Sequence, residues 1–354
     1  MKHPAVVLED VSIVFGRRPE AALPLADEGM SRADIQSRTD QVLGVHRCSL
    51  EVQEGEIVVL MGLSGSGKST LLRAVNRLNP ITSGRVLVND GSGMADIGAA
   101  DTRTLRRLRR TRIAMVFQQF GLLPWRNVTD NIMFALELGG VPRAERTAKA
   151  EEQLSLVGLT GWGDRRVAEL SGGMQQRVGL ARAFATEAPI LLMDEPFSAL
   201  DPLIRSRLQD ELIALQRNLQ RTIIFVSHDL DEAFKIGDRI AIMEGGRIVQ
   251  CGTPAAIIRN PANDYVADFV AHMNPLGVLT VADVMAPGTA PADAPVVGPE
   301  TKAAEIMAFL GSGRTVAVRD GTGETVGVVR PADLLAALVA TERTGANGAA
   351  DGAA

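Results

Sequence analysis

The stretch "GLSGSGKST", Gly62 to Thr70, decides the fold class of this 354-residue chain. It lies between the apolar run "IVVLM" and the helix-like segment "STLLRAVNRL", and it fits the pattern G-x-x-x-x-G-K-[ST]. In this setting the backbone N–H groups of small residues wrap around phosphate groups, and the helix dipole attracts the anion. We expect phosphate contacts from Gly62, Ser64, Gly65, Ser66, Gly67, Lys68, Ser69 and Thr70.

A carboxylate pair is the second candidate feature, because "ILLMDEP" places Asp194 and Glu195 at the end of an apolar strand. With Lys68 reaching the β- and γ-phosphates of a nucleotide, Ser69 and Asp194 are expected to hold Mg²⁺. Glu195 is expected to polarise the attacking water, since phosphoryl transfer needs positioning and charge more than a strong base. Alone, "DE" after a strand is often a solvated strand end, but the phosphate-binding loop favours the catalytic interpretation.

Three other side chains carry weaker signals. Gln118 ends the run "IAMVFQ" and offers a neutral amide to Mg²⁺ or to the attacking water. His228 ends "TIIFVSH", although a lone histidine is more often a surface or core residue. Phe15 has a ring face that can stack on adenine, although a single Phe in an N-terminal strand is more often core.

The alternation of short apolar runs with helix-period segments between Ile57 and Gln250 predicts a mostly parallel sheet covered by helices. Its central strands are expected at "IVVLMG", "IAMVFQ", "ILLMDE" and "TIIFVSH". Open sheets of this class bind ligands at the carboxyl ends of their strands. The polar residues that end these runs should therefore gather at one edge.

The N-terminal part is expected to add antiparallel strands beside this sheet, at "VVLEDVSIVF" and "CSLEVQ". Between them lies an insertion, residues 17–43, in which Ser31 and Asp34 have the spacing of a helix-capping box. We expect a short helix there, packed on the outside.

Composition places the chain in the ordinary globular class, with 46% hydrophobic and 22% charged residues and a net charge of −5. This net negative charge gives no indication of nucleic-acid binding, which usually requires a basic surface. No apolar run is long enough to span a bilayer and no signal-peptide pattern starts the chain, which predicts a cytoplasmic protein. Cys48 and Cys251 have no metal-ligand spacing, and we expect buried thiols rather than a disulfide.

A run of six arginines, Arg103 to Arg112, leaves two interpretations open. One is a patch for nucleic acid or lipid headgroups. We favour the other, a solvated helix that leads into "IAMVFQ", because no interleaved aromatic residues offer base stacking.

A second anion-binding feature, "AELSGGMQQRVGLARAF" from Ala168 to Phe184, puts a Gly pair at the start of a helix but has no Lys. This stretch, "GLSGSGKST", "FQQF", "ILLMDEP", "SALD" and "SHD" occur in the order found in ABC transporter ATPases, and the chain resembles that family. The resemblance implies a P-loop NTPase cassette of the α/β class, with a mostly parallel sheet, an antiparallel β subdomain and a helical signature subdomain.

The same resemblance implies ATP and Mg²⁺ as cofactors and assigns roles by position. Phe15 matches the aromatic residue that stacks on adenine, and His228 matches the switch histidine at the γ-phosphate. Gln118 matches the loop that senses Mg²⁺ and the membrane partner. In a homodimer, the signature loop of one subunit would complete the phosphate site of the other subunit. Asp201 would lie at the seam of this dimer. The residues that match the signature loop are Ser171, Gly172, Gly173 and Gln175.

Long blocks from Val6 to Val284 are similar to the importers of quaternary amines, the glycine betaine, proline betaine and choline systems, and "FGLLPWR" resembles choline importers. This implies a motor subunit at the cytoplasmic face of the membrane, working on a separate integral-membrane permease and, through it, an extracytoplasmic substrate-binding protein. The rival interpretations are a soluble ABC-type ATPase not coupled to transport and an exporter subunit. A soluble type would usually carry two cassettes or a long coiled coil.

The expected domain limits are residues 1–275 for the ATPase, 276–340 for a small α+β module and 341–354 for a disordered tail. The small module resembles a single CBS half-module, with Asp333 at its nucleotide-facing position. CBS motifs normally occur in pairs. We favour two interpretations over nucleotide sensing: the half-module is a remnant that binds no ligand, or it pairs with its copy in another subunit.

Overall fold

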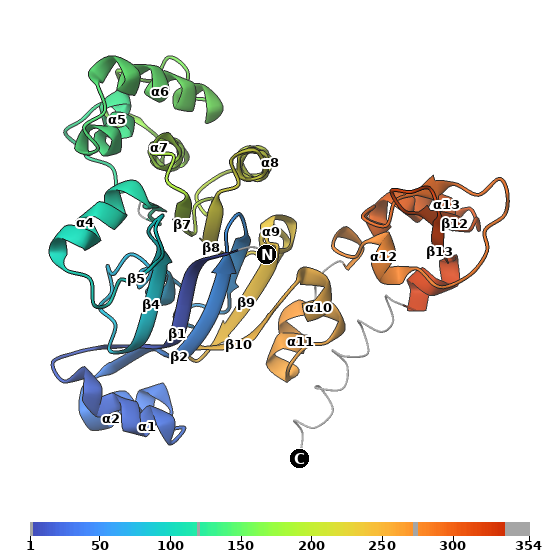
Figure 1. Cartoon of the computed structure of the whole chain (residues 1–354), viewed down its shortest axis with the longest axis horizontal. Helices are drawn as coiled ribbons and strands as arrows, with labels where there is room; N and C mark the ends of the chain where they lie inside the picture. Colours follow the sequence, from blue (N-terminus) through green and yellow to red (C-terminus); the bar gives the residue numbers. More distant parts are fainter. Residues whose placement is uncertain (1–2, 119–120, 272–274, 337–354) are drawn as a thin grey trace. The chain divides into compact units, whose positions relative to one another are not determined.

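The computed structural model describes residues 3–118, 121–271 and 275–336 (Figure 1). The chain divides into two compact units, Met1–Glu232 with Ala241–Ile248, and Ala233–Ile240 with Val249–Ala354. The second unit begins earlier in the chain than residue 276, and the domain limits given above stay predictions. The proposed tail, 341–354, lies outside the described residues.

A six-stranded sheet forms the core that the apolar runs predicted. Its strand order is β10, β9, β3, β8, β7, β6, and β3, β8, β7 and β6 pair in parallel. Every residue of β3, β7 and β8 is buried, as expected for strands covered on both faces. The strands are β3 (Ile57–Met61), β6 (Ile113–Val116), β7 (Ile190–Asp194), β8 (Thr222–Val226), β9 (Arg239–Glu244) and β10 (Arg247–Gly252).

A separate antiparallel sheet, in the order β2, β1, β4, β5, confirms the expectation for the N-terminal segments. Its strands are β1 (Pro4–Phe15), β2 (Val42–Gln53), β4 (Ser83–Asn89) and β5 (Met94–Asp96). β1 ends at Phe15, opposite Val42 of β2, so the insertion leaves and re-enters this sheet at one place. Figure 1 shows the insertion at that end of the two strands.

The insertion contains η1 (Pro19–Ala22), α1 (Leu23–Asp27) and α2 (Arg32–Thr39). Ser31 caps α2, because its Oγ accepts a hydrogen bond from the Asp34 N–H at 3.2 Å. Ile35 of α2 is fully buried and packs with a small cluster of its own: Val14, Ala22, Ala26 and Leu43. One face of α2 is therefore fixed to the end of the antiparallel sheet.

The remaining helices of the first unit are α3 (Lys68–Leu72), α4 (Thr102–Thr111), α5 (Val128–Leu138), α6 (Arg143–Leu156), η2 (Val167–Glu169), α7 (Gly172–Ala185) and α8 (Pro202–Leu219), with α9 (Leu230–Ile236) at the division. α5, α6 and α7 pack on one another as a helical group (Figure 1). This group carries the start of α7, where the second anion-binding stretch lies.

The arginine-rich run forms α4 and leads into β6, as predicted. Its side chains are not merely solvated. Arg107 pairs with Asp90 at 2.8 Å, and Arg109 Nε donates to the carbonyl oxygen of Asn76 at 2.8 Å. Part of the charge therefore holds neighbouring segments of the same unit together.

The second unit contains a three-stranded sheet, β11 (Val296–Val297), β12 (Val316–Arg319) and β13 (Thr325–Val329), with β11 parallel and β13 antiparallel to β12. Its other elements are α10 (Pro254–Arg259), α11 (Asp264–Val270), η3 (Pro275–Gly277), α12 (Val281–Val284), η4 (Ala303–Ile306) and α13 (Met307–Gly311). Leu279, Val281, Ile306, Val316 and Val329 belong to its buried core.

The segment "TKAAEIMAFL" is divided into η4 and α13 rather than forming one continuous helix. Its first two residues are held by the segment around α12. The Val281 N–H donates to the Thr301 carbonyl oxygen at 2.7 Å, and Lys302 Nζ donates to the Val278 carbonyl oxygen at 3.0 Å. The first helical turn therefore begins only at Ala303, with Lys302 as its N-cap.

Two smaller expectations concern the cysteines and the membrane. Cys48 and Cys251 form no disulfide in the described part of the chain; Cys48 is buried and Cys251 is half-buried. Burial raises the pKa of Cys48 to about 11. Within the described ranges, no helix combines the length and the apolar character needed to cross a bilayer.

Candidate functional site

The loop "GLSGSGKST" connects β3 to α3 in the predicted strand, loop and helix order. Gly67 caps α3 with φ = 100°, in the left-handed region that favours glycine. A Cβ at Gly67 would lie 2.7 Å from Val45 Cγ1 and 2.8 Å from the Gly44 carbonyl oxygen. The loop therefore approaches β2 so closely that only glycine fits at this position.

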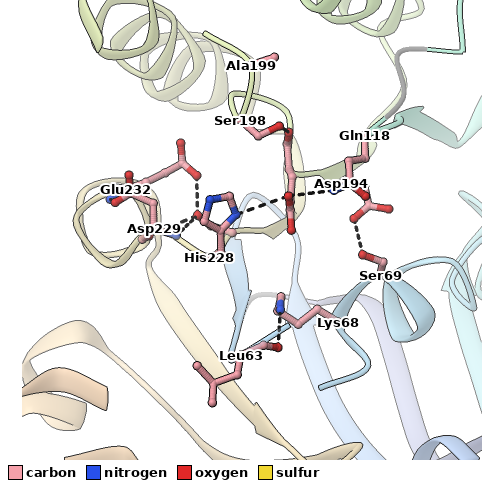
Figure 2. Close-up of polar contacts among 12 residues, drawn as sticks. Leu63, Lys68, Ser69, Gln118, Asp194, Ser198, Ala199, His228, Asp229 and Glu232 are labelled. Carbon is pink, nitrogen blue, oxygen red and sulfur yellow. Dashed lines mark hydrogen bonds and ion pairs between the residues drawn. The ribbon is translucent and has the colours of Figure 1, made fainter. Parts of the chain in front are cut away.

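Lys68 is the first residue of α3, with 6% of its surface exposed. Its Nζ donates to the carbonyl oxygen of Gly62 at 2.8 Å. It also donates to the carbonyl oxygen of Leu63 at 3.0 Å (Figure 2). Burial lowers the pKa of Lys68, and the charges of Glu195 and Asp194 oppose that shift. Because a phosphate oxygen is a charged acceptor, it is a stronger partner for this ammonium than the two carbonyls.

Ser66 supplies a second sign of a phosphate site. Its side chain is 5% exposed, and its Oγ has no hydrogen-bond partner among the described residues. A buried hydroxyl without a partner costs free energy unless a ligand or water satisfies it. Phosphate oxygens in the loop would do so.

Asp194 and Ser69 meet at the end of β7. Ser69 Oγ donates to Asp194 Oδ1 at 2.6 Å (Figure 2). Arg73, at the end of α3, donates to Asp194 Oδ2 from Nη2 at 2.9 Å and Nε at 3.2 Å, and Asp194 is fully buried. A hydroxyl and a carboxylate oxygen side by side are the hard oxygen ligands that Mg²⁺ requires, so these two residues fit the ion.

Glu195 follows β7 with φ = 47°, an uncommon value for a residue other than glycine. Its carbonyl oxygen accepts hydrogen bonds from Gln176 Nε2 at 3.3 Å and Ser198 Oγ at 3.1 Å, and its N–H donates to the Val226 carbonyl oxygen at 3.2 Å. These contacts hold the strained turn in place. Such strain persists only where surrounding structure enforces it, and it is common at active sites.

The Glu195 carboxylate is the meeting point of two other candidates. Gln118 Nε2 donates to Glu195 Oε2 at 3.0 Å, and His228 Nδ1 lies 3.4 Å from the same oxygen (Figure 2). The three side chains come from the carboxyl ends of β6, β7 and β8, which are parallel neighbours. A water held here would be in reach of a carboxylate, an amide and an imidazole.

A hydrogen-bonded group beneath His228 was not predicted from the sequence. Glu232 is 7% exposed, and its carboxylate accepts from Ser227 Oγ at 2.5 Å and Gln209 Nε2 at 3.0 Å. Burial raises the pKa of Glu232. Ser227 Oγ also accepts from the Asp229 N–H at 3.0 Å, so the turn that carries His228 is fixed on both sides.

A pocket of about 680 Å³ joins these features. Phe15, 38% exposed, Val42 and Leu43 form one part of its lining, and the phosphate-binding loop forms another. Gln118, Glu195 and His228 complete it, together with two residues of α2 that sequence reasoning missed, Arg32 and Gln36. No spacing pattern marked these two, because the direction of α2 follows from its packing.

The signature residues lie elsewhere. Ser171 caps α7 by accepting from the Met174 N–H at 3.3 Å, and Asp201 caps α8 by accepting from the Ile204 N–H at 3.0 Å. Gln175 Nε2 donates to the carbonyl oxygens of Val167 and Leu170. Within the described part of the chain, the lining of the pocket includes none of the five predicted residues Ser171, Gly172, Gly173, Gln175 and Asp201.

Known proteins resemble the chain over most of its length. The family described as "ABC transporter" matches residues 45–198. The Escherichia coli glycine betaine/proline betaine transport system ATP-binding protein ProV is 52% identical over 271 residues, 77% of this chain and 67% of ProV. The trimethylamine N-oxide transport system ATP-binding protein TmoW of Pelagibacter ubique is 42% identical over 345 residues, 97% of this chain and 100% of TmoW.

A solved structure shows the same cassette architecture. It is described as a dimeric, post-hydrolysis state of an ATP-binding cassette bound to ADP and Pi. Its TM-score to this chain is 0.61 at 29% identity, over 70% of this chain and 98% of that one.

Proposed function

Because the chain belongs to the ATP-binding proteins of ABC transporters, we propose that it is the ATP-hydrolysing motor subunit of an importer for glycine betaine or a related quaternary amine. The observation that carries the ATPase chemistry is the set of three contacts at the end of β7: Ser69 with Asp194, Gln118 with Glu195, and His228 with Glu195. A purely structural cluster would not need a strained glutamate beside a phosphate-binding loop.

Each side chain has a task in hydrolysis. Lys68 holds the β- and γ-phosphates, and Ser69 and Asp194 hold Mg²⁺, which neutralises charge on those phosphates when it is bound. Glu195 orients the attacking water and accepts a hydrogen bond from it. Gln118 and His228, both in reach of the Glu195 carboxylate, position that water and the γ-phosphate.

A homodimer completes the site. Ser171 and the start of α7 expose N–H groups that attract an anion, but they do not line the pocket of their own chain. The similar cassette described as a dimer supports the proposal that the signature of one copy covers the nucleotide of the other. Phe15 would stack on adenine, and Asp201 would lie at the seam between the two copies.

The membrane partner is proposed to dock on the segment after Gln118. Trp125 is 68% exposed, and exposed aromatic side chains are enriched at protein–protein interfaces. Buried Asn131 supports the segment, because its Oδ1 accepts from the Leu123 N–H at 2.7 Å and its Nδ2 donates to the Leu123 carbonyl oxygen at 3.1 Å. We place the subunit at the cytoplasmic face of the membrane, bound to its permease and, through the permease, linked to a substrate-binding protein.

Trp125→Ala tests this docking. Transport-coupled hydrolysis in the assembled transporter is expected to fall about thirtyfold, because one aromatic anchor often supplies about 2 kcal/mol of an interface. The ATPase rate of the isolated subunit should stay unchanged. Leu219→Ala removes an exposed apolar side chain at the end of α8 and is the matched control. Equal effects of both substitutions would contradict docking at Trp125.

The substrate class is tested by reconstitution with the neighbouring permease and binding protein, comparing ATP-driven uptake of glycine betaine, proline betaine, trimethylamine N-oxide and choline. The two relatives described above are named for betaines and for trimethylamine N-oxide. We therefore do not expect choline to be preferred over the other three substrates. We expect uptake of at least one quaternary amine or amine oxide. ATPase activity that no substrate or permease stimulates would support the alternative of an ATPase not coupled to transport.

The C-terminal module is proposed as a single CBS-like unit within residues 276–340, either a remnant or a contact with its copy. Its small sheet and buried core support an independently packed element. Ending the chain before Val281 should leave ATP-driven uptake intact. Loss of uptake in a chain that still hydrolyses ATP would overturn the remnant interpretation.

A further inference from the structure

The insertion contributes a cation to the nucleotide pocket. Arg32 and Gln36 are one turn apart on α2, so they lie on the same face of the helix, and both line the pocket. Ile35 anchors α2 in its own buried cluster. The position of Arg32 is therefore set by packing.

Arg32 connects the two ends of the pocket. Its Nη1 donates to the carbonyl oxygen of Gly65, in the phosphate-binding loop, at 2.6 Å, and its Nη2 donates to the carbonyl oxygen of Gly44 in β2. Gly44 lies against the adenine-stacking candidate, since a Cβ there would be 2.9 Å from Phe15 Cε2. The guanidinium thus lies between the proposed adenine site and the phosphate loop.

The charge of Arg32 has no carboxylate partner among the described residues. Its Nε is buried without a hydrogen-bond partner in the described part of the chain, and burial lowers its pKa. Arginine nevertheless stays charged in proteins. A half-buried cation with unused N–H groups requires an anion or water to satisfy it.

From this geometry we infer that Arg32 binds the nucleotide at the phosphate nearest the ribose, which makes the insertion part of the ATP site. This inference rests on the proposed function, because it requires a nucleotide in the pocket. The guanidinium holds Gly44 and Gly65 through two N–H groups and keeps others for the phosphate oxygen, a charge-assisted contact.

The test is calorimetric titration of the full chain with adenosine, AMP and ADP. For Arg32→Ala we expect affinity for AMP and for ADP to fall by about tenfold each, the worth of one charge-assisted contact. Adenosine binding should change less than about twofold, because it has no phosphate to lose. Arg32→Lys keeps the charge and should recover much of the loss, whereas Arg32→Gln should resemble Arg32→Ala.

Arg38→Ala is the matched control, since Arg38 is an exposed arginine of α2 outside the pocket lining. Thermal melting without nucleotide checks that each variant is folded. If Arg32→Ala weakens the binding of ADP but not the binding of AMP, Arg32 only supports the phosphate-binding loop and the inference is wrong. Equal affinities of Arg32→Ala and Arg38→Ala would also overturn it. Failure of the unaltered chain to bind ADP would instead count against the proposed function.

Discussion

Replacing Glu195 with Gln lowers the rate of ATP hydrolysis by about a hundredfold or more, the usual contribution of a positioned general base. The amide keeps the size of the side chain and leaves Lys68, Ser69 and Asp194 in place, so ATP and Mg²⁺ should still bind. The bound ATP should then hold two copies together, because hydrolysis no longer removes the γ-phosphate. Phosphate release and sedimentation with and without ATP measure the two effects.

Glu152→Gln is a suitable control for this experiment, since Glu152 is an exposed glutamate on α6, outside the pocket lining. It should change neither the turnover rate nor the dimer. Unchanged turnover in Glu195→Gln would remove Glu195 from its proposed role, and the contacts from Gln118 and His228 would then need another explanation.

Replacing Ser171 with Arg abolishes hydrolysis and ATP-driven dimerisation but leaves nucleotide affinity within about twofold. The reason is geometric, because Ser171 begins α7 and does not line the pocket of its own chain. A long cation there blocks the N-terminus of α7 and opposes the helix dipole. Loss of the Ser171 N-cap lowers the free energy of unfolding by about 1 kcal/mol. A small fall in the melting temperature measures this loss.

Ser155→Arg, at an exposed serine on α6, introduces the same side chain on another helix of the group that packs around α7 and is the control for Ser171→Arg. It should leave hydrolysis unchanged. If Ser171→Arg weakens ADP binding by the isolated subunit tenfold or more, the signature acts within its own chain and the two-copy site is wrong.

The part of the site that the sequence predicts well lies at strand ends. Gln118, Glu195 and His228 each follow a buried parallel run, and parallel neighbours bring their carboxyl ends to one edge. The strong apolar runs fix the strands, and the strands bring together residues more than a hundred positions apart. Backbone topology alone therefore accounts for this cluster.

The contacts from Arg32 and Arg73 could not be predicted in the same way. Both depend on the direction of a short helix, which is set by tertiary packing and not by spacing along the chain. The Glu232 group is a similar case, because Ser227, Gln209 and Glu232 meet only after α8 and the β8–α9 turn are packed. An isolated glutamate in a helix carries no sequence signal of burial.

The central claim is that each nucleotide is enclosed by Lys68 of one copy and Ser171 of another, and the most direct test mixes two inactive variants. Lys68→Ala cannot hold the phosphates, and Ser171→Arg cannot complete the partner's site. A mixed dimer has one site with both residues intact, so the mixture should recover ATPase activity that neither variant shows alone. No recovery, in a sample where mixed dimers are shown to form, would contradict the account.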